Sequence, residues 1–326
     1  MEERVCFGID VGGTTIKIGL FSDTLELLEK WEIPTPKKGK SADTLPLIVY
    51  NIKKIMFEKE ITECIGIGIC VPGPVLEDGT VRECVNLGWE EFNIKEKIKT
   101  MLGLEVWAGN DANAAAFGEV RLGAGIMDAV MITLGTGIGG GIIYKGEILI
   151  GSNGSAGEIG HINVAGQEGF MCGCGKNGCV ETVASGKGIV RLGQKMLEYY
   201  KGETVLKKEE LTAKAIFENA EKGDELSNMI VRKSMKYLAK AMANISAVID
   251  SEAFIIGGGV SNAGKFLIDI IKEEYEKAAF KGNRGKKILI AKLGENAGIY
   301  GAAAKLLELV DGDSLDYALY RRNLKS

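Results

Sequence analysis

The feature that most constrains the fold is a pattern that the chain contains twice, in which alternating apolar residues flank a glycine-rich turn. The first copy, VCFGIDVGGTTIKIGLFSD, starts at Val5, and the second, DAVMITLGTGIGGGIIYKGEIL, starts at Asp128. Apolar residues at every second position predict β-strands, and a glycine turn between two such runs predicts a β-hairpin. The chain therefore has two halves that begin in the same way.

Strand-like and helical segments alternate after each predicted hairpin. The first half continues with TLELLEKWEIPTP (strand), PLIVYNIKKIMFEKE (helix), CIGIGICVPGP (buried strand), NIKEKIKTMLG (helix), LEVWAGND (strand) and ANAAAFGEVRLG (helix). The second half contains the long helix ELSNMIVRKSMKYLAKAMANISAVID and the buried strand AFIIGGGVS. Two similar halves of this kind predict duplicated α/β domains with a cleft between them. We expect an N-terminal domain over residues 1–119 and a C-terminal domain over residues 120–302, with a helix at about residues 303–326 packing back on the first domain.

Length and charge agree with two domains and exclude some partners. A chain of 326 residues is long for one hydrophobic core. The net charge of −4 offers no attraction to nucleic acid or to an anionic membrane. No apolar run is long enough for a membrane helix, and the N-terminus has no signal-peptide pattern. The seven cysteines do not resemble a secreted disulfide framework, so we expect a cytosolic protein that binds neither nucleic acid nor membranes.

The second glycine turn matches a dinucleotide-binding motif in letters only. Residues 135–140, GTGIGG, satisfy G-x-G-x-x-G, but a strand follows the turn where that motif requires a helix. A P-loop sequence is also absent from the chain. Two glycine turns in matching places favour instead a clamp for phosphate groups, because backbone N–H groups without Cβ atoms can approach phosphate oxygens closely. The alternative is that both turns are only tight hairpins.

Several polar residues around the turns suit a bound nucleotide. Threonine hydroxyls could donate hydrogen bonds, Lys17 could add a positive charge, and Asp10 could hold a magnesium ion through water. The residues of the first turn and its flanks are Asp10, Gly12, Gly13, Thr14, Thr15 and Lys17, and those of the second are Gly135, Thr136, Gly137 and Gly139.

At this level of detail the sequence resembles the ROK family of sugar kinases. GIDVGGTTIKIGL, GNDANAAAFGE, LGTGIGGGII, AGEIGH, CGCGKNGCVET and IIGGGVS occur in the family's order over nearly the whole chain. SNGSAGEIGH and CVETVASGKGI are most similar to the family's ATP-dependent glucokinases. The resemblance implies the actin/hexokinase/Hsp70-like fold, which is ribonuclease H-like, and the ATP-dependent phosphorylation of glucose at its 6-hydroxyl. It also leads us to expect a homodimer or homotetramer.

The resemblance assigns roles to particular residues. Asp111 corresponds to the catalytic base, since a carboxylate can take the proton of the attacking hydroxyl. Read without the family, Asn110 and Asp111 could equally cap the next helix. Positions that match sugar-binding residues are Asn110, Glu158, His161 and Glu181, with Asn86 and Gly73 on bordering loops. Gly257, Gly258 and Gly259 match the loop beside the adenosine, or else form a plain strand-to-helix turn.

The single histidine of the chain precedes a cluster of three cysteines. His161, Cys172, Cys174 and Cys179 offer one nitrogen and three sulfurs, a complete tetrahedral set for structural zinc, and their spacing is that of the family's zinc motif. Disulfide pairing is the alternative, but it suits a cytosolic protein poorly and leaves one thiol over. Because imidazole has two nitrogens, we expect one to bind zinc and the other to reach the sugar.

Other functions remain compatible with these motifs. A ROK kinase for N-acetylglucosamine, N-acetylmannosamine, fructose or allose would share them, and pocket shape would decide between the sugars. A catalytically weak sugar-sensing regulator is a further alternative, which the intact Asp111 and the expected lack of a DNA-binding extension disfavour. An actin-like or chaperone ATPase is disfavoured by the zinc motif. The sequence leaves the phosphoryl donor open.

Overall fold

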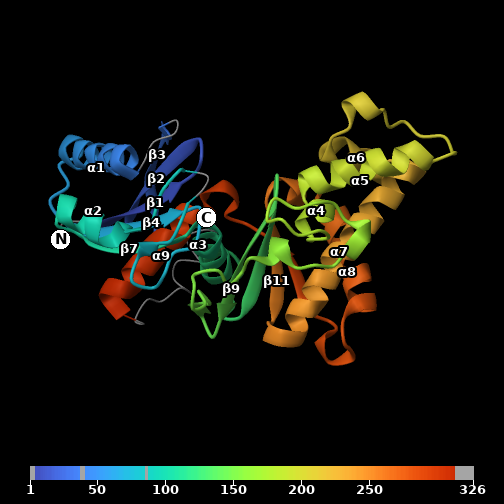
Figure 1. Cartoon of the computed structure of the whole chain (residues 1–326). Helices are drawn as coiled ribbons and strands as arrows, with labels where there is room; N and C mark the ends of the chain where they lie inside the picture. Colours follow the sequence, from blue (N-terminus) through green and yellow to red (C-terminus); the bar gives the residue numbers. More distant parts are fainter. Residues whose placement is uncertain (1–3, 37–40, 85–86, 313–326) are drawn as a thin grey trace. The chain divides into compact units, whose positions relative to one another are not determined.

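The computed structural model describes residues 4–36, 41–84 and 87–312 of the chain. The chain divides into two compact units, each with its own sheet (Figure 1). The expected domain boundary after residue 119 and the expected cleft stay predictions, and residues 313–326 of the expected C-terminal helix lie outside the described residues. Unit 1 is Met1–Ile126, Gly141–Gly157 and Lys292–Ser326, and unit 2 is Met127–Gly140 and Glu158–Ala291.

The sheet of unit 1 has the strand order β3-β2-β1-β4-β7. The predicted first hairpin is confirmed, because β1 and β2 pair antiparallel, and β3 pairs antiparallel with β2. Strands β4 and β7 lie parallel to β1, so the carboxyl ends of β1, β4 and β7 meet at one edge of the sheet. Asp10 and Asn110 lie at this edge. The bounds are β1 Val5–Val11, β2 Thr15–Ser22, β3 Leu27–Pro34, β4 Cys64–Val71 and β7 Glu105–Asn110.

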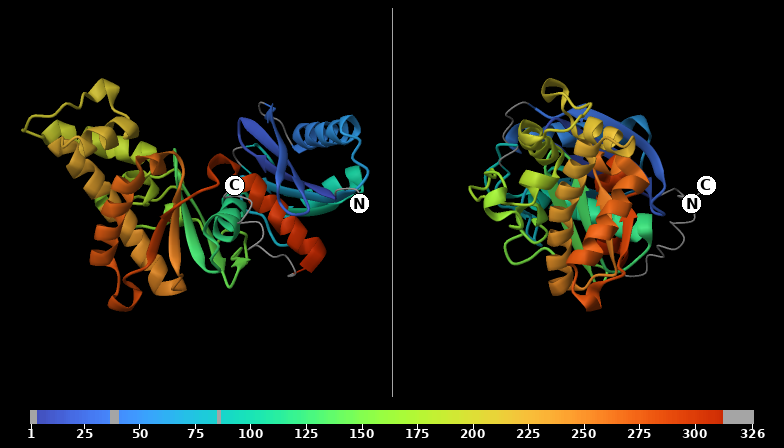
Figure 2. Two further views of the ribbon diagram at one scale, coloured as in Figure 1. Left: turned by 180° about the vertical axis from the view of Figure 1, so that it is seen from behind. Right: turned by 90° about the vertical axis from the view of Figure 1, so that its right-hand side faces the viewer.

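Helices cover both faces of this sheet (Figures 1 and 2). Apolar side chains of α1 (Ser41–Glu58) and α2 (Ile94–Leu102) join the main core on one face. On the other face lie α3 (Asp111–Gly118) and α9 (Ala297–Asp311). Two short strands, β5 (Thr80–Val81) and β6 (Phe92–Asn93), form a separate ribbon.

Helix α9 lies unusually close to its neighbours because glycines face it. A Cβ atom on Gly68 of β4 would lie 1.9 Å from the carbonyl oxygen of Ala302, and one on Gly301 of α9 would lie 1.8 Å from that of Ala114 in α3. Any side chain at either glycine would force the helix away from the sheet or from α3. These glycines therefore fix the place of α3, whose first residue is Asp111.

The sheet of unit 2 has the order β10-β9-β8-β11-β12, and β11 pairs parallel with β8 and with β12. Strands β8 and β9 are neighbours on either side of the second glycine turn, which confirms the predicted strand, turn and strand. Strand β9 begins in unit 2 and continues into unit 1 from Gly141. The bounds are β8 Ala129–Leu134, β9 Ile138–Tyr144, β10 Glu147–Ile148, β11 Ala253–Gly257 and β12 Lys287–Ile290.

The predicted long helix of unit 2 is α7, Glu225–Ile249, which packs against α5, α6 and α8. Asp224 caps it, since its side chain accepts the N–H of Ser227. Its apolar residues Leu226, Ile230, Leu238, Met242 and Ile245 are buried. The other helices are α4 Glu181–Ala184, α5 Gly186–Tyr199, α6 Ala213–Glu221 and α8 Gly264–Ala278, with single turns η2 Ile159–His161, η3 Gly166–Glu168, η4 Lys208–Glu210, η5 Gly259–Ala263, η6 Lys281–Asn283 and η7 Gly294–Asn296.

One predicted helix changes character along its length. The segment expected as one α-helix ends as α3 at Gly118 and continues as a π-helix, η1, over Glu119–Ala124. Glu119 is only 1% exposed, and its carboxylate accepts the backbone N–H groups of Lys292 and Leu293 at 2.8 and 2.6 Å. These buried bonds hold the chain at the point where the helix widens.

Among the described residues, no helix has both the length and the apolar character needed to cross a membrane.

Candidate active site and metal centre

Asp111 is held in place by the cap of its own helix. Asn110 precedes α3, and its side-chain oxygen accepts the N–H of Asn113 at 3.0 Å, so the capping interpretation is confirmed for Asn110. Its amide also donates to Asp111 Oδ1 at 3.0 Å and to the carbonyl oxygen of Gly73 at 3.0 Å. Asp111 Oδ1 accepts in addition the N–H of Ala112 at 2.7 Å. Capping thus orients the carboxylate, and it brings the candidate sugar residues Gly73 and Asn110 together.

Burial and a second carboxylate raise the pKa of Asp111. The largest cause is loss of solvation, and the negative charge of Asp10 adds to it, so the pKa rises from 3.8 to about 6. The bonds from Ala112 and Asn110 act in the opposite direction. Burial also raises the pKa of Asp10, against the charge of Lys17. A carboxylate with a pKa near 6 is ionised at neutral pH yet still a useful proton acceptor.

Cys70 lies beside these two carboxylates. The cysteine is fully buried at the end of β4, and its Sγ is 3.4 Å from the carbonyl oxygen of Ile9 and 3.7 Å from Asp10 Oδ1. Burial, followed by the charges of Asp10 and Asp111, raises the pKa of the Cys70 thiol. The group therefore stays protonated and donates to Asp10.

The first glycine turn is a tight, exposed hairpin. The N–H of Gly12 donates to the carbonyl oxygen of Thr15 at 2.9 Å, while Gly13 and Thr14 are exposed at its tip. Thr35 secures the turn from the end of β3, since its hydroxyl donates to the carbonyl oxygen of Gly12 at 2.7 Å. Lys17 follows the turn on β2, where its ammonium donates to the carbonyl oxygen of Glu295 at 3.0 Å. Asn86, the remaining candidate of this half, lies outside the described residues.

The second glycine turn, Gly135–Gly137, lies between β8 and β9 of unit 2. The N–H of Gly135 donates to the carbonyl oxygen of Gly137 at 3.0 Å, and Thr136 is exposed at the tip. The carbonyl oxygen of Gly135 accepts the N–H of Gly186, at the start of α5, at 2.8 Å. Gly139, further along β9, is half-buried.

The predicted adenosine-side loop meets the second turn in the same unit. Gly258 has φ +81°, and a Cβ atom there would lie 2.6 Å from the carbonyl oxygen of Leu134. Only glycine satisfies both conditions, so β11 can end against β8. Gly257 is buried at the end of β11, and Gly259 begins η5.

A pocket of about 1130 Å³ lies within unit 2. Gly135 and Thr136 of the second turn and Gly259 line it, which brings these three predicted residues to one site. The rest of the lining was not predictable from the sequence, because single residues on helices and loops carry no motif. This remainder includes the apolar Leu211, Phe217 and Phe266 and the basic Lys187 and Arg191.

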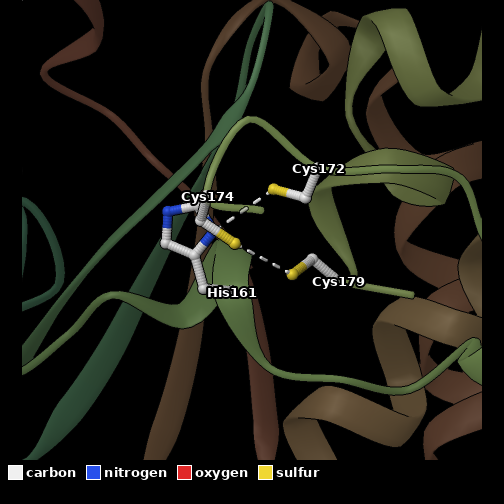
Figure 3. A group of neighbouring side chains, drawn as sticks. All are labelled: His161, Cys172, Cys174 and Cys179. Carbon is white, nitrogen blue, oxygen red and sulfur yellow. Dashed lines mark hydrogen bonds between the residues drawn. The ribbon is translucent and has the colours of Figure 1, made fainter. Parts of the chain in front are cut away.

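The histidine and the three cysteines converge as predicted (Figure 3). One ligand atom from each of the four residues lies within 4.8 Å of the others. His161 Nδ1 is 3.5 Å from Cys172 Sγ, and the Sγ atoms of Cys174 and Cys179 are 3.6 Å apart. Ligands at zinc–sulfur and zinc–nitrogen distances on a tetrahedron would be about 3.5–3.8 Å apart. The cluster therefore fits a tetrahedral metal ion, and in the described part of the chain Cys172, Cys174 and Cys179 form none of the alternative disulfides.

A tight turn brings the thiols together. The N–H of Cys172 donates to the carbonyl oxygen of Lys176 at 2.9 Å, and Gly175 and Gly178 adopt φ values of +83° and +84°. The backbone N–H of Lys176 lowers the pKa of Cys174, whereas burial raises the pKa of Cys179 to about 12. A thiolate at Cys179 thus needs a nearby cation, which a bound metal would supply.

The imidazole of His161 has two different neighbours. Its Nδ1 points to Cys172, and its Nε2 lies 3.8 Å from Glu158 Oε2. Glu158 itself is exposed. With Nδ1 on a metal, Nε2 carries the proton and donates outward, which suits a carboxylate or a hydroxyl.

Each unit contains one sheet flanked by helices, and each of these sheets includes two strands joined by a glycine-rich turn. This arrangement defines the actin/hexokinase-like α/β class of phosphotransferases. The model of the ROK family matches residues 6–308. The chain belongs to the ROK family, as the sequence motifs predicted.

Several proteins similar to this chain are sugar kinases. The chain is 41% identical to the glucokinase of Halalkalibacterium halodurans over 92% of this chain and 94% of that protein. It is 33% identical to the N-acetylmannosamine kinase of Escherichia fergusonii over 90% of this chain and 96% of that protein. Among solved structures, a ROK glucokinase from Streptomyces griseus in complex with glucose and AMPPNP has a TM-score of 0.72 and 32% identity, covering 92% of this chain and 98% of its own.

Proposed function

We propose that this protein transfers the γ-phosphoryl group of ATP to the 6-hydroxyl of glucose, giving glucose 6-phosphate and ADP. The observation that carries the proposal is Asp111, a carboxylate fixed by a helix cap, with a pKa of about 6, in a chain of the ROK family. The sequence similarity to glucokinases favours glucose among the hexoses. The relative crystallised with glucose and AMPPNP supports ATP as the donor.

In this mechanism Asp111 takes the proton of the sugar 6-hydroxyl as its oxygen attacks the γ-phosphorus. The bonds from Ala112 and Asn110 occupy Oδ1, which leaves Oδ2 for the hydroxyl. Phosphoryl transfer otherwise depends on positioning and on neutralising the phosphate charge. Asp10 would hold Mg²⁺ through water, and the ion would supply part of that neutralisation.

The nucleotide would use both glycine turns and the pocket of unit 2. Exposed backbone at residues 12–15 and 135–137 suits phosphate oxygens, while the apolar lining at Leu211, Phe217 and Phe266 suits adenine. Lys187 and Arg191 line the same pocket and add positive charge. We assign Gly257, Gly258 and Gly259 to the adenosine side of the nucleotide site and Gly139 to its phosphate side.

For the sugar we propose Gly73, Asn86, Asn110, Asp111, Glu158, His161 and Glu181. Amide and carboxylate groups suit hydroxyls, which both donate and accept hydrogen bonds. The four-residue cluster of His161, Cys172, Cys174 and Cys179 would hold structural zinc, because four protein ligands leave no open position on the metal. A cluster of three cysteine ligands also suits the cytosol, a reducing compartment.

A second candidate is a kinase for N-acetylmannosamine or N-acetylglucosamine, favoured by relatives at 33% and 31% identity. ADP release with Mg-ATP over a panel of glucose, mannose, fructose, allose and the two amino sugars decides between them. We expect the highest kcat/KM with glucose. A higher value with an acetamido sugar would replace the first proposal by the second, and no ADP release with any sugar would refute both.

The substrate panel needs a variant that distinguishes ADP release by this protein from ADP release by contaminating kinases. Asp111→Asn should abolish the sugar-dependent ADP release. Asp43→Asn is the matched control, because Asp43 is an exposed aspartate in the first turn of α1 in the same unit. If both variants keep full activity, Asp111 is not the base.

A further inference from the structure

The carboxylate of Glu181 contacts both the second glycine turn and the cluster formed by the histidine and the three cysteines. Glu181 Oε2 accepts the backbone N–H of Ile138 at 2.9 Å, and Ile138 directly follows Gly135–Gly137. The same oxygen lies against Gly137, where a Cβ atom would be only 2.3 Å from it. A half-buried carboxylate thus packs against the turn at the point where β9 begins.

The other side of Glu181 faces the cysteine cluster. Glu181 begins α4 two residues after Cys179, and its Oε1 is 4.0 Å from Cys172 Sγ. Gly186, five residues further on, donates its N–H to the carbonyl oxygen of Gly135 at 2.8 Å. The segment 181–186 therefore contacts the turn at two points, and the contact through Glu181 is the one made by a side chain.

We propose that Glu181 is a positioning residue for the turn Gly135–Gly137, in addition to its role toward the sugar. A charged acceptor holds the N–H of Ile138 more strongly than a neutral one, so the carboxylate fixes the direction of the neighbouring amides. The identity of the turn's ligand, a nucleotide phosphate, rests on the proposed function. The effect of Glu181 on the conformation of the turn is independent of the proposed function.

The consequence is that nucleotide binding depends on a sugar-site residue even when no sugar is present. A residue that only contacts sugar would leave nucleotide affinity unchanged when it is replaced. Glu181→Ala should weaken binding of Mg-AMPPNP without glucose about tenfold, the effect of losing one hydrogen bond of ordinary strength. Glu181→Gln should lose less, because its amide oxygen can still accept the N–H of Ile138.

Hydrogen exchange tests the positioning without any ligand. In the full-length, metal-loaded protein, the Ile138 amide of Glu181→Ala should exchange at least about tenfold faster than in wild type. Glu198→Ala is the matched control: Glu198 is an exposed glutamate of α5 in the same unit, outside the proposed site, and its carboxylate pairs with Lys208. It should change neither Ile138 exchange nor Mg-AMPPNP affinity.

Gly137→Ala provides an independent variant. The new methyl group would displace the carboxylate of Glu181 and so break the same hydrogen bond from the other side. Its effect on Mg-AMPPNP affinity should therefore not add to that of Glu181→Ala in the double variant. Full additivity would contradict the contact.

The outcomes separate this proposal from the proposed function. Unchanged Ile138 exchange in Glu181→Ala, with normal metal content and circular dichroism, overturns the positioning role. Faster exchange together with unchanged Mg-AMPPNP affinity overturns the link to the nucleotide. If wild type binds no nucleotide while exchange is still faster in Glu181→Ala, the proposed function fails and the positioning of the turn stands.

Discussion

Replacing Asp111 by asparagine tests the proposed chemistry most directly, because it changes little else. The new amide oxygen can accept the same two bonds, from Ala112 at 2.7 Å and from Asn110 at 3.0 Å. The cap of α3 should therefore survive. What disappears is the negative charge and the ability to take a proton, and loss of a general base lowers the rate by about 10²–10⁴.

The same substitution should stabilise the fold. Burial and Asp10 raise the pKa of Asp111 in the folded protein to about 6, above its unfolded value of 3.8. Between these values the folded state holds a proton that the unfolded state has lost, so stability falls as pH rises through this window. The shift corresponds to at most about 3 kcal/mol, and partial exposure of the side chain reduces it to about 1–2 kcal/mol. Asp111→Asn removes this penalty above pH 6.

Two measurements, one on wild type and one comparing it with Asp111→Asn, check both effects. The kcat/KM of wild type, followed by ADP release, should fall as pH drops below about 6, because Asp111 becomes protonated there. Urea denaturation at neutral pH should show Asp111→Asn to be more stable than wild type, and the difference should vanish near pH 4. Turnover close to wild type would refute the base assignment. Lower stability of the variant at neutral pH would refute the electrostatic argument.

Three further predictions concern the metal, the π-helix and the sugar. Chelation or Cys172→Ala should raise the glucose KM and lower kcat, while the circular dichroism spectrum stays native. A metal assay on the same sample should show that zinc is lost. A zinc-free protein with full activity would contradict this prediction. Glu119→Gln should lower the free energy of unfolding in urea by about 2 kcal/mol, because one carboxylate oxygen that accepts buried N–H groups becomes a donor. Glucose should exceed N-acetylglucosamine in kcat/KM by about 10² or more, and a reversed order would contradict the glucokinase assignment.

Features that depend on neighbouring residues were predictable from the sequence. Alternating apolar residues predicted β1 and β2, and their pairing is confirmed. The motif of one histidine and three cysteines, matched to that of the family, predicted that these side chains converge, and Gly175 and Gly178 provide the sharp turn that brings the thiols together. Cys6 and Cys70 lie in apolar strand-like runs of the sequence and are buried, while Cys64, at the start of such a run, is half-buried.

Contacts between distant residues were not predictable in this way. Glu119 is one of many acidic residues in a helical pattern, and nothing near it indicates that it binds amides at residues 292–294. Cys70 lies in an apolar run that predicts only a buried strand, and its place beside Asp10 follows from the parallel pairing of β1 and β4. The pocket residues on α5, α6 and α8 are likewise brought together only by packing of helices.

For several residues the structural and the functional interpretation, given above as alternatives, hold together in the structure. Asn110 was either a helix cap or a functional residue, yet the bond that caps α3 belongs to the same side chain that orients Asp111. His161 directs one nitrogen to Cys172 and the other toward Glu158, and Glu181 lies between the cysteine cluster and the second turn. A buried polar group needs a partner whatever its role, so a catalytic or binding side chain at a helix start or beside a turn will form structural bonds too. Structural bonds at these residues are therefore no argument against function, and variants that keep the bond while removing the charge are the ones that separate the two.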